Sequence, residues 1–386
     1  MKNLWIVFVS FLVTTTAWPS PLPSQENDWN VFRGNPQSTG VAATDLPETL
    51  EVVWEYKIPE RNGAFEGTPL IVKDPDGSKT VYANDLDGSM YALDLDTGKL
   101  KWSKKLSISI GASPAYQDGF IYSGDIDGII YCLDTKGDLK WKFSADAEVS
   151  SPNFYKGNLV FGSQDAHIYM INGKTGELIW KKETPDQIQC SVTVADDRAF
   201  VAGCDGFFHV VSLEDGRELG NVDIHSPTQC TPAVSGSQVF FGTEQAEFFA
   251  VDWKKIKAEW NFMDSKGQSS VRGCAAVTKE HVVFGARNRQ VYSLDPVTGK
   301  QNWTRLLKSK VDSSPTIVGD KVYVGATDGR FYVLSLKSGD ILWEKQLKGG
   351  ILASPAAAHK RVVVATDEGV VYCLGKQSAS SKPQPE

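Results

Sequence analysis

A chain of 386 residues with 41% hydrophobic residues can bury a large core, and its length alone favours two or three domains. Its formal net charge of −7 at pH 7 excludes the strongly basic classes of protein, so we expect no nucleic-acid partner. The internal repeats described below replace the estimate from length with a single domain.

The amino terminus has the features of a secretory signal. Lys2 precedes an apolar run over residues 4–13, and the small residues at 15–17 form a cleavage site. We therefore expect residues 1–17 to be a signal peptide and the mature chain to be exported to the periplasm or the extracellular space. The apolar run is too short to span a bilayer, so no transmembrane span is expected in the mature chain, with a retained anchor as the alternative. No cysteine precedes Cys132, which predicts that a lipoprotein attachment site is absent.

Residues 18–44 are rich in Pro, Ser, Asn and Thr and show no sustained periodicity, which predicts a linker. The linker contains a W-x-x-F-R-G segment that begins at Trp29. We expect Trp29 and Phe32 to cover an exposed apolar end of the domain that follows. Ligand binding by these two rings is the alternative.

Residues 80–102 hold a pattern that the rest of the chain repeats. The sequence TVYANDLDGSMYALDLDTGKLKW predicts three short strands, separated by an Asp87-Gly88 hairpin turn and by a second turn at residues 96–98. With the apolar run at residues 68–72 before it, one copy contains four strands. Four strands are the content of one propeller blade.

A tryptophan closes most copies of the repeat, and its spacing counts them. Leu219 occupies the missing place between Trp180 and Trp260, and the resulting intervals of 39 to 48 residues suit four-stranded blades. These eight positions, one for each copy of the repeat, predict an all-β fold: a single eight-bladed β-propeller over residues 45–376. The predicted docking residues are Trp54, Trp102, Trp141, Trp180, Trp260, Trp303 and Trp343.

The repeat also carries a family resemblance. Residues 92–102, with Asp94, Gly98 and Trp102, resemble the A-x-D-x-x-x-G-x-x-x-W tryptophan-docking repeat of the PQQ-like β-propellers, and degenerate copies recur over roughly residues 50–375. That family includes quinoprotein dehydrogenases, which bind pyrroloquinoline quinone, and non-enzymatic members such as the BamB factor of outer-membrane β-barrel assembly. The W-x-x-F-R-G segment is also similar to one that precedes such propellers in secreted bacterial proteins. The resemblance implies the fold more firmly than the function, because one fold hosts many functions.

The two ends of the repeat region complement each other. Residues 51–57 supply a tryptophan strand without the three strands that should precede it, whereas residues 354–374 supply three strands and no tryptophan strand. We expect the first strand to complete the last blade, which removes two exposed sheet edges. The polar segment at residues 377–386 is expected to be a disordered tail.

The resemblance to the dehydrogenases implies an adjacent cysteine pair, calcium ligands, a catalytic aspartate and long insertions around the cofactor. The six cysteines are never adjacent, and the repeat intervals leave no room for a large insertion. We therefore expect no catalytic residue and no cofactor. The alternative is a quinone-dependent or other redox enzyme, with pyrroloquinoline quinone and calcium as its cofactors.

Hydrolytic and metal chemistry is not indicated either. The five histidines show no metal-like spacing, and we expect each to be packed or solvated rather than a base. Aspartate-rich turns such as residues 85–88 lack the liganding Glu of a calcium loop, so we interpret them as ordinary turns. The five histidines are His167, His209, His225, His281 and His359.

Export makes disulfide bonds possible. Cys190 is expected to lie opposite, or one place from, Cys204, and it occupies an inner-strand place equivalent to that of Cys230 in the next blade. A disulfide from Cys190 to either partner stays open beside the preferred hypothesis of free buried thiols. Cys132 and Cys373 occupy equivalent places in blades that are not neighbours, so they are not expected to pair.

The residues three places before each inner-strand proline, or its equivalent, predict a binding face. Around the ring they are Glu66, Gly111, Val149, Gln189, Gln229, Arg272, Asp312 and Leu352, so blades four to seven are polar in succession. The turns between second and third strands emerge on the same face and add polar residues, Glu247 among them. We expect a ligand or partner face at this mouth of the channel, made of Gln189, Gln229, Arg272, Asp312, Glu244, Arg287, Asn288 and Arg289. The alternative is a solvated rim in which internal ion pairs neutralise the arginines.

These features together predict an exported, monomeric and non-catalytic β-propeller. We expect it to serve as a scaffold in the bacterial cell envelope that binds an envelope protein or a glycan through one face.

Overall fold

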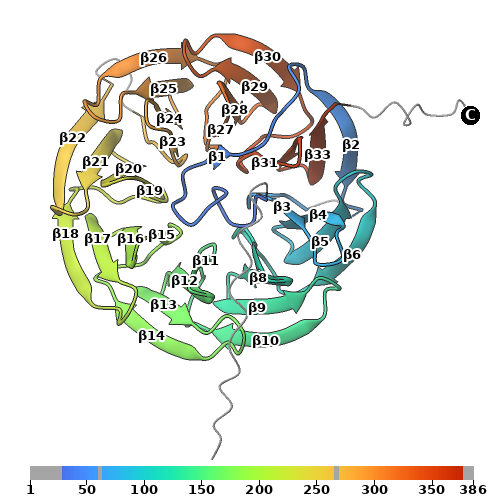
Figure 1. Cartoon of the computed structure of the whole chain (residues 1–386), viewed down its shortest axis with the longest axis horizontal. Coiled ribbons are helices and arrows are strands. Elements are labelled where there is room, and N and C mark those ends of the chain that lie inside the picture. The colour runs from blue at the N-terminus through green and yellow to red at the C-terminus, as the bar shows by residue number, and fades with distance from the viewer. Residues whose placement is uncertain (1–27, 60–62, 265–268, 377–386) are drawn as a thin grey trace, which may run out of the picture.

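The computed structural model describes residues 28–59, 63–264 and 269–376, and every regular element within these ranges is a β-strand. The strands form eight sheets arranged radially around one axis, each sheet being a blade (Figure 1). The predicted all-β, eight-bladed propeller is therefore confirmed.

Each blade contains four antiparallel strands, and a two-residue strand, β1 (Val41–Ala42), adds in parallel to the inner edge of one of them. From the inner to the outer strand, the blades in chain order are β3 (Leu70–Lys73), β4 (Lys79–Asn84), β5 (Ser89–Asp94) and β6 (Leu100–Lys105); β7 (Ala115–Gln117), β8 (Phe120–Gly124), β9 (Ile129–Asp134) and β10 (Leu139–Ser144); β11 (Asn153–Tyr155), β12 (Asn158–Ser163), β13 (His167–Ile171) and β14 (Leu178–Glu183); β15 (Thr193–Ala195), β16 (Arg198–Ala202), β17 (Phe207–Ser212) and β18 (Glu218–Asp223); β19 (Ala233–Ser235), β20 (Gln238–Gly242), β21 (Glu247–Asp252) and β22 (Lys257–Met263); β23 (Ala276–Val277), β24 (Val282–Gly285), β25 (Gln290–Leu294) and β26 (Gln301–Leu306); β27 (Thr316–Val318), β28 (Lys321–Gly325), β29 (Arg330–Ser335) and β30 (Ile341–Gln346); and β31 (Ala356–Ala358), β32 (Arg361–Ala365), β33 (Val370–Gly375) and β2 (Glu51–Lys57).

The burial of each strand follows its place in the blade. A middle strand such as β33 is buried at every position, because both of its faces pack against neighbouring blades. An outer strand such as β22 alternates between exposed and partly buried positions along its whole length. The apolar runs and alternating runs of the repeat therefore correspond to these two environments.

The ring closes as the ends of the sequence predict. β2 pairs antiparallel with β33, from Glu51 opposite Gly375 to Lys57 opposite Val370. The strand from the beginning of the repeat region thus completes the blade from its end. β33 therefore has a partner on both sides, and the last blade has four strands like the others.

At six of the eight interfaces, a tryptophan of the outer strand docks on a glycine in the next blade. The Trp54 ring lies so close to Gly98 that a Cβ at this glycine would come within 2.6 Å of the ring. Gly98 also has a φ of 71°, so the turn favours glycine for both reasons. The indole N–H of Trp54 donates to the Leu95 carbonyl at 2.7 Å. The same stacking joins Trp102 to Gly137, Trp141 to Gly176, Trp180 to Gly216, Trp260 to Gly299 and Trp303 to Gly339.

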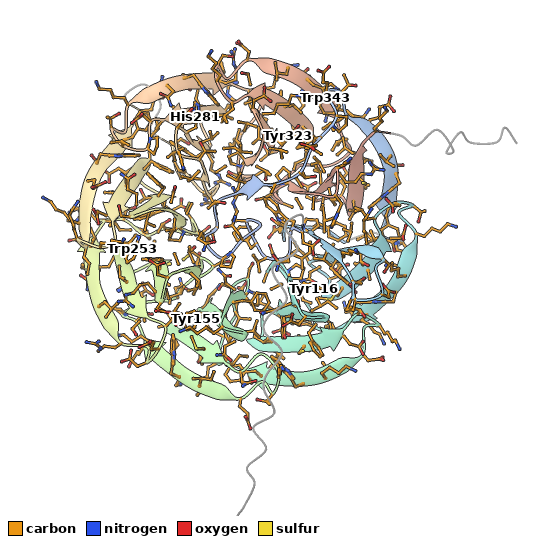
Figure 2. All side chains as sticks on the ribbon, viewed as in Figure 1. Tyr116, Tyr155, Trp253, His281, Tyr323 and Trp343 are labelled. Carbon is orange, nitrogen blue, oxygen red and sulfur yellow. The ribbon has the colours of Figure 1, made fainter. Side chains whose placement is uncertain are left out.

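Two interfaces depart from this rule. Trp343 faces a blade whose third and fourth strands come from opposite ends of the chain, so no turn joins them there. Between blades four and five, Gly220 takes the strand position of the docking tryptophans: it lies opposite Val210, as Trp180 lies opposite Met170 in the preceding blade. The prediction of Leu219 for this place is therefore wrong by one residue, and Leu219 is only partly buried. Trp253 of blade five packs edge-on against Phe200 of blade four, with ring centroids 5.4 Å apart. Figure 2 shows Trp253 and Trp343 toward the outside of the ring. A tryptophan from the other side of the interface therefore replaces the missing one.

The described residues of the predicted linker, 28–44, are part of the ring, which corrects that prediction. They cross the inside of the channel (Figure 1), and their carbonyls accept backbone N–H groups from the inner strands of six blades at 2.8–3.0 Å. The pairs are Ile71 to Trp29, Tyr116 to Asn30, Val194 to Pro36, Val234 to Gln37, Val277 to Thr39 and Ile317 to Gly40. Inner strands otherwise present unpaired donors, and this segment satisfies them.

The two aromatic rings of the W-x-x-F-R-G segment lie in different surroundings. Trp29 is 1% exposed and bridges to Ile71, so its ring is covered as expected. Phe32, by contrast, faces an axial cavity. The predicted signal peptide at residues 1–17 and the predicted tail at residues 377–386 lie outside the described residues.

Candidate functional site

The channel of the propeller holds an axial cavity of about 250 Å³. It is lined by inner-strand residues that precede the proline position, whereas the N-terminal segment bonds to residues that follow it. The segment therefore closes one end of the channel, and Phe32 contributes to the floor of the cavity. All eight positions singled out in the sequence line this one cavity: Glu66, Gly111, Val149, Gln189, Gln229, Arg272, Asp312 and Leu352.

A ring of small polar side chains lies on the cavity wall, and the sequence analysis missed it. These residues immediately precede the proline position and are Thr68, Ser113, Ser151, Ser191, Thr231, Cys274, Ser314 and Ser354. The backbone N–H of Thr68 donates to the Ser113 hydroxyl oxygen at 2.8 Å, and five further bonds of this kind link successive blades. Because the oxygens accept these bonds, the hydroxyl hydrogens stay available to a ligand in the cavity. A Ser or Thr before each proline was the signal in the sequence.

The arginines of the predicted face are largely neutralised. Arg272 Nε donates to Glu244 at 2.9 Å, and Arg287 Nε donates to Asp312 at the same distance. The bond to Asp312 raises the pKa of Arg287 above its usual value. The alternative of internal ion pairs therefore holds for these two arginines, which form inter-blade ion pairs at the rim.

The other predicted residues fall into two groups. Gln189 and Gln229 line the cavity, and Gln229 is exposed there. Asn288 instead donates to the Tyr292 hydroxyl at 2.7 Å, away from the cavity, and Arg289 is exposed in its turn. The structure brings Gln189, Gln229, Arg272 and Asp312 together around the cavity and joins Glu244 and Arg287 to them through ion pairs. It does not bring Asn288 or Arg289 into the cavity lining.

The opposite wall of the cavity is acidic. Glu66 is exposed and Glu148 is partly buried, and both line the cavity. Burial, and secondarily the charge of Glu66, raises the pKa of Glu148, although a hydrogen bond from Gln164 opposes the shift. The cavity thus presents hydroxyl and amide groups with two carboxylates on one side, which suits a polar ligand rather than a strongly anionic one.

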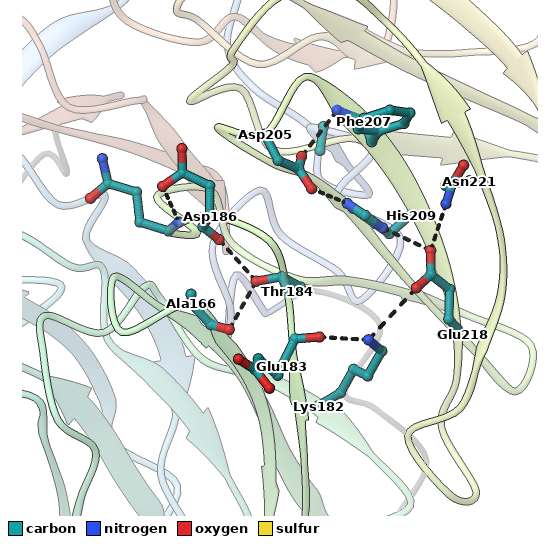
Figure 3. Close-up of polar contacts among 12 residues, drawn as sticks. Ala166, Lys182, Glu183, Thr184, Asp186, Asp205, Phe207, His209, Glu218 and Asn221 are labelled. Carbon is teal, nitrogen blue, oxygen red and sulfur yellow. Dashed lines mark hydrogen bonds and ion pairs between the residues drawn. The ribbon is translucent and has the colours of Figure 1, made fainter.

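His209 is packed into a blade, as expected. Figure 3 shows its ring between Asp205 and Glu218, at 2.8 Å from Nε2 and 3.0 Å from Nδ1. Burial alone would lower the pKa of His209, but the two carboxylate hydrogen bonds outweigh burial and raise it. In blades one to three, a tyrosine hydroxyl donates to the equivalent aspartate, so this histidine replaces a structural tyrosine. The tyrosines are Tyr91, Tyr131 and Tyr169.

All six cysteines are free thiols in the structure. The alternative of a disulfide through Cys190 is therefore not observed, and the Cys190 thiol donates to the Ala202 carbonyl at 3.3 Å. β15 and β16 are joined by a turn at Asp196, but Cys190 and Cys204 form no bond.

The cavity does not fit the quinone cofactor of the dehydrogenases. That cofactor carries three carboxylates, which would meet Glu66 and Glu148 at the wall. The arginines nearest the cavity, Arg272 and Arg287, are already paired with carboxylates. Phe32 and the segment behind it fill the depth of the channel. No cluster of three or more His, Cys, Asp or Glu side chains suited to a metal ion occurs among the described residues.

Comparisons with known proteins agree with the repeat pattern. The family described as outer membrane protein assembly factor BamB matches residues 86–269 and 260–378. The chain is 26% identical over 298 residues to the BamB protein of Burkholderia pseudomallei (strain K96243), a match that covers 72% of this chain and 75% of that protein. It spans 45% to 47% of the length of three other curated relatives with the same description.

Solved structures share the architecture. BamB from Moraxella catarrhalis superimposes with a TM-score of 0.70 and 15% identity, covering 87% of this chain and 100% of that chain. A quinohemoprotein alcohol dehydrogenase from Comamonas testosteroni superimposes with a TM-score of 0.77 and 14% identity, covering 94% of this chain and 82% of that chain. At these identities the likeness shows the fold alone. The family match extends over well more than half of the sequence, so the chain belongs to the BamB family of PQQ-like repeat β-propellers.

Proposed function

We propose that this chain is a non-catalytic scaffold of the bacterial cell envelope that assists outer-membrane protein assembly by binding a segment of a partner protein at the mouth of its axial cavity. The observation that carries the proposal is the cavity itself, which is closed at one end and lined by all eight blades. The printed role of the relatives, outer membrane protein assembly factor, supplies the class of partner. No helix among the described residues has the length and apolarity needed to span a bilayer.

The chemistry of the wall favours a polar, extended ligand. Hydroxyl donors and the amides of Gln189 and Gln229 suit the carbonyls of a peptide loop, and Phe32 offers an apolar contact below them. A cavity of about 250 Å³ accepts one or two side chains rather than a folded domain. A partner would therefore insert a loop tip and rest on the surrounding rim, where Arg272 pairs with Glu244. A glycan uses the same donors, and the test below separates it from a protein.

The test fills the cavity without disturbing the fold. Gly111 lines the cavity with ordinary backbone geometry, and a Cβ there would meet only the Leu86 side chain, at 3.8 Å. Gly111→Trp should therefore block the cavity at little cost in stability. The control is Lys136→Trp, an exposed position in a turn between third and fourth strands, which the antiparallel alternation places on the opposite face.

The measurement is co-purification of envelope proteins with each variant, beside binding to a glycan array. The proposal predicts that Gly111→Trp loses the protein partner and that Lys136→Trp keeps it. Retention of the partner by Gly111→Trp contradicts the proposal, and loss of glycan binding instead of protein binding assigns the cavity to a sugar.

The alternative function is a quinone-dependent dehydrogenase, the class of the Comamonas enzyme that shares the fold. The acidic wall and the filled channel do not suit the quinone cofactor, which weighs against this alternative. Adding pyrroloquinoline quinone and calcium to the purified protein separates the two functions. A red-shifted absorbance with dye reduction in the presence of alcohols would establish the enzyme.

A further inference from the structure

Arg33 is a buried cation with an incomplete set of partners. Its side chain is 0% exposed, and Nη2 donates to the carbonyls of Ala275 and Pro315. Nε and Nη1 have no hydrogen-bond partner, and no carboxylate among the described residues pairs with this guanidinium. Burial lowers the pKa of Arg33 to about 10, which leaves it charged at neutral pH. A buried charge without a counter-charge costs several kcal/mol, so the structure requires an anion close to Arg33.

Two cysteines from neighbouring blades supply the charged groups that act on Arg33. The Thr231 N–H donates to the Cys274 sulfur at 3.3 Å, and the Cys230 thiol donates to the Gly273 carbonyl at 3.5 Å. Each sulfur therefore lies against the backbone beside the other cysteine, which brings the two cysteines of neighbouring blades together. Cys230 is fully buried, whereas Cys274 is 4% exposed and lines the cavity.

Of the two cysteines, Cys274 is the one that the surroundings favour as the thiolate. The neighbouring Cys230 lowers the pKa of Cys274, and Arg33 and Ser314 lower it further, although burial opposes the shift. In the same pair, the pKa of Cys230 is raised. The thiolate is the nucleophilic form of cysteine, so Cys274 combines reactivity with access from the cavity. It also interrupts a ring that has hydroxyls in the other seven blades.

We propose that Cys274 is a reactive thiolate on the wall of the cavity, which small hydroperoxides oxidise, and that Cys230 is its resolving thiol. The Cys274 sulfur attacks the terminal oxygen of the peroxide, the O–O bond breaks, and an alkoxide leaves and takes a proton to become an alcohol. Cys274 is then a sulfenic acid. The Cys230 sulfur attacks the Cys274 sulfur, a disulfide forms and water leaves, so the two cysteines lose two electrons to the peroxide. This site is independent of partner binding at the rim.

The experiment exposes the full chain to a small excess of hydrogen peroxide at pH 7 and blocks the remaining thiols. Peptide mass spectrometry should find a Cys230–Cys274 disulfide, with Cys274 oxidised at least tenfold faster than Cys204. Cys204 is the internal control, because it is more exposed than Cys274 but burial raises its pKa. Cys230→Ser keeps a hydrogen-bond donor and lacks the resolving sulfur, so dimedone should trap the sulfenic acid on Cys274.

Two further variants test the source of the reactivity. Arg33→Met should slow the oxidation of Cys274 at least tenfold, provided that the near-ultraviolet circular dichroism matches that of the parent. Cys274→Ser restores the hydroxyl of the other blades and should abolish the disulfide while preserving the fold. The proposal is overturned if Cys204 reacts first in the parent, or if dimedone labels no cysteine in Cys230→Ser. These two results do not depend on the folding of Arg33→Met.

Discussion

Ile256 occupies the docking-glycine position of blade five, and its side chain lies against Gly220 of blade four. A Cβ at Gly220 would come within 2.6 Å of the Ile256 Cδ1 atom. Ile256 has a φ of 52°, whereas the six equivalent residues are glycines with φ between 69° and 81°. A β-branched residue in this region is strained. The isoleucine is explained by Gly220, which takes the tryptophan position opposite Val210: without a tryptophan ring to stack on the turn, the isoleucine side chain fills the space.

This relationship predicts coupling between Gly220 and Ile256. Gly220→Trp alone should destabilise the ring, because the indole would meet the Ile256 side chain. Ile256→Gly alone should relieve strain of about 1–3 kcal/mol but leave a gap over Gly220. The double variant should restore the docking geometry of the other blades. Urea unfolding of all four proteins measures the coupling, expected at about 1–3 kcal/mol, and additive effects would contradict the account.

The docking tryptophans should dominate stability between blades. Trp303 is 7% exposed and its indole N–H donates to the Leu336 carbonyl at 2.8 Å. Trp303→Ala should therefore cost about 3–5 kcal/mol. Leu219→Ala should cost less, since Trp253 covers that interface, and Trp253→Ala should cost more than Leu219→Ala. Equal losses in Leu219→Ala and Trp303→Ala, measured by denaturant unfolding, would refute this ranking.

His209 should give stability a specific pH dependence. Its pKa is raised in the folded state, so its contribution is complete below the unfolded value near 6.5 and is lost as pH rises through the folded value. His209→Tyr places the residue of blades one to three opposite Asp205 and should remove this loss. The check is the melting temperature of both proteins from pH 5.5 to 9. Parallel curves would show that the histidine is not the titrating group.

Closure by β2 should be necessary for a monomeric ring. Deleting residues 50–57 leaves β33 with an unpaired edge and removes the Trp54 contact with Gly98. We expect aggregation or a loss of cooperative unfolding, because open sheet edges pair with other chains. Light scattering and calorimetry measure both effects. A monomeric deletion variant with the parent melting temperature would show that closure is dispensable.

Repetition explains what the sequence could predict. Trp54 at one end and three unpaired strands at the other predicted the closure, and the spacing of the inner-strand prolines predicted that Gln189, Gln229, Arg272 and Asp312 share one mouth. Backbone contacts leave no such pattern. The path of residues 28–44 depends on backbone carbonyls between Trp29 and Gly40. Every residue has such a carbonyl whatever its side chain, so the sequence of this segment resembled a linker.

Inter-blade pairing was equally hard to predict. Arg272 meets Glu244 because the start of one inner strand lies beside a turn of the preceding blade, and the sequence alone does not fix those side-chain directions. The exchange of Trp and Gly for Gly220 and Ile256 broke the repeat where it was used to count blades, so the missing tryptophan was assigned one residue too early, to Leu219. The ring of hydroxyls was visible in the sequence only as a Ser or Thr before each proline.

The central claim is that a partner protein inserts into the cavity mouth. A photo-crosslinking amino acid in place of Gln229, which is exposed at that mouth, tests it in whole cells, with the same replacement of Lys136 on the opposite face as the control. The account predicts a crosslinked envelope protein from position 229 and none from position 136. The crosslink should disappear when Gly111→Trp is added. A crosslink from position 136 alone, or one from position 229 that survives Gly111→Trp, would contradict binding in the cavity.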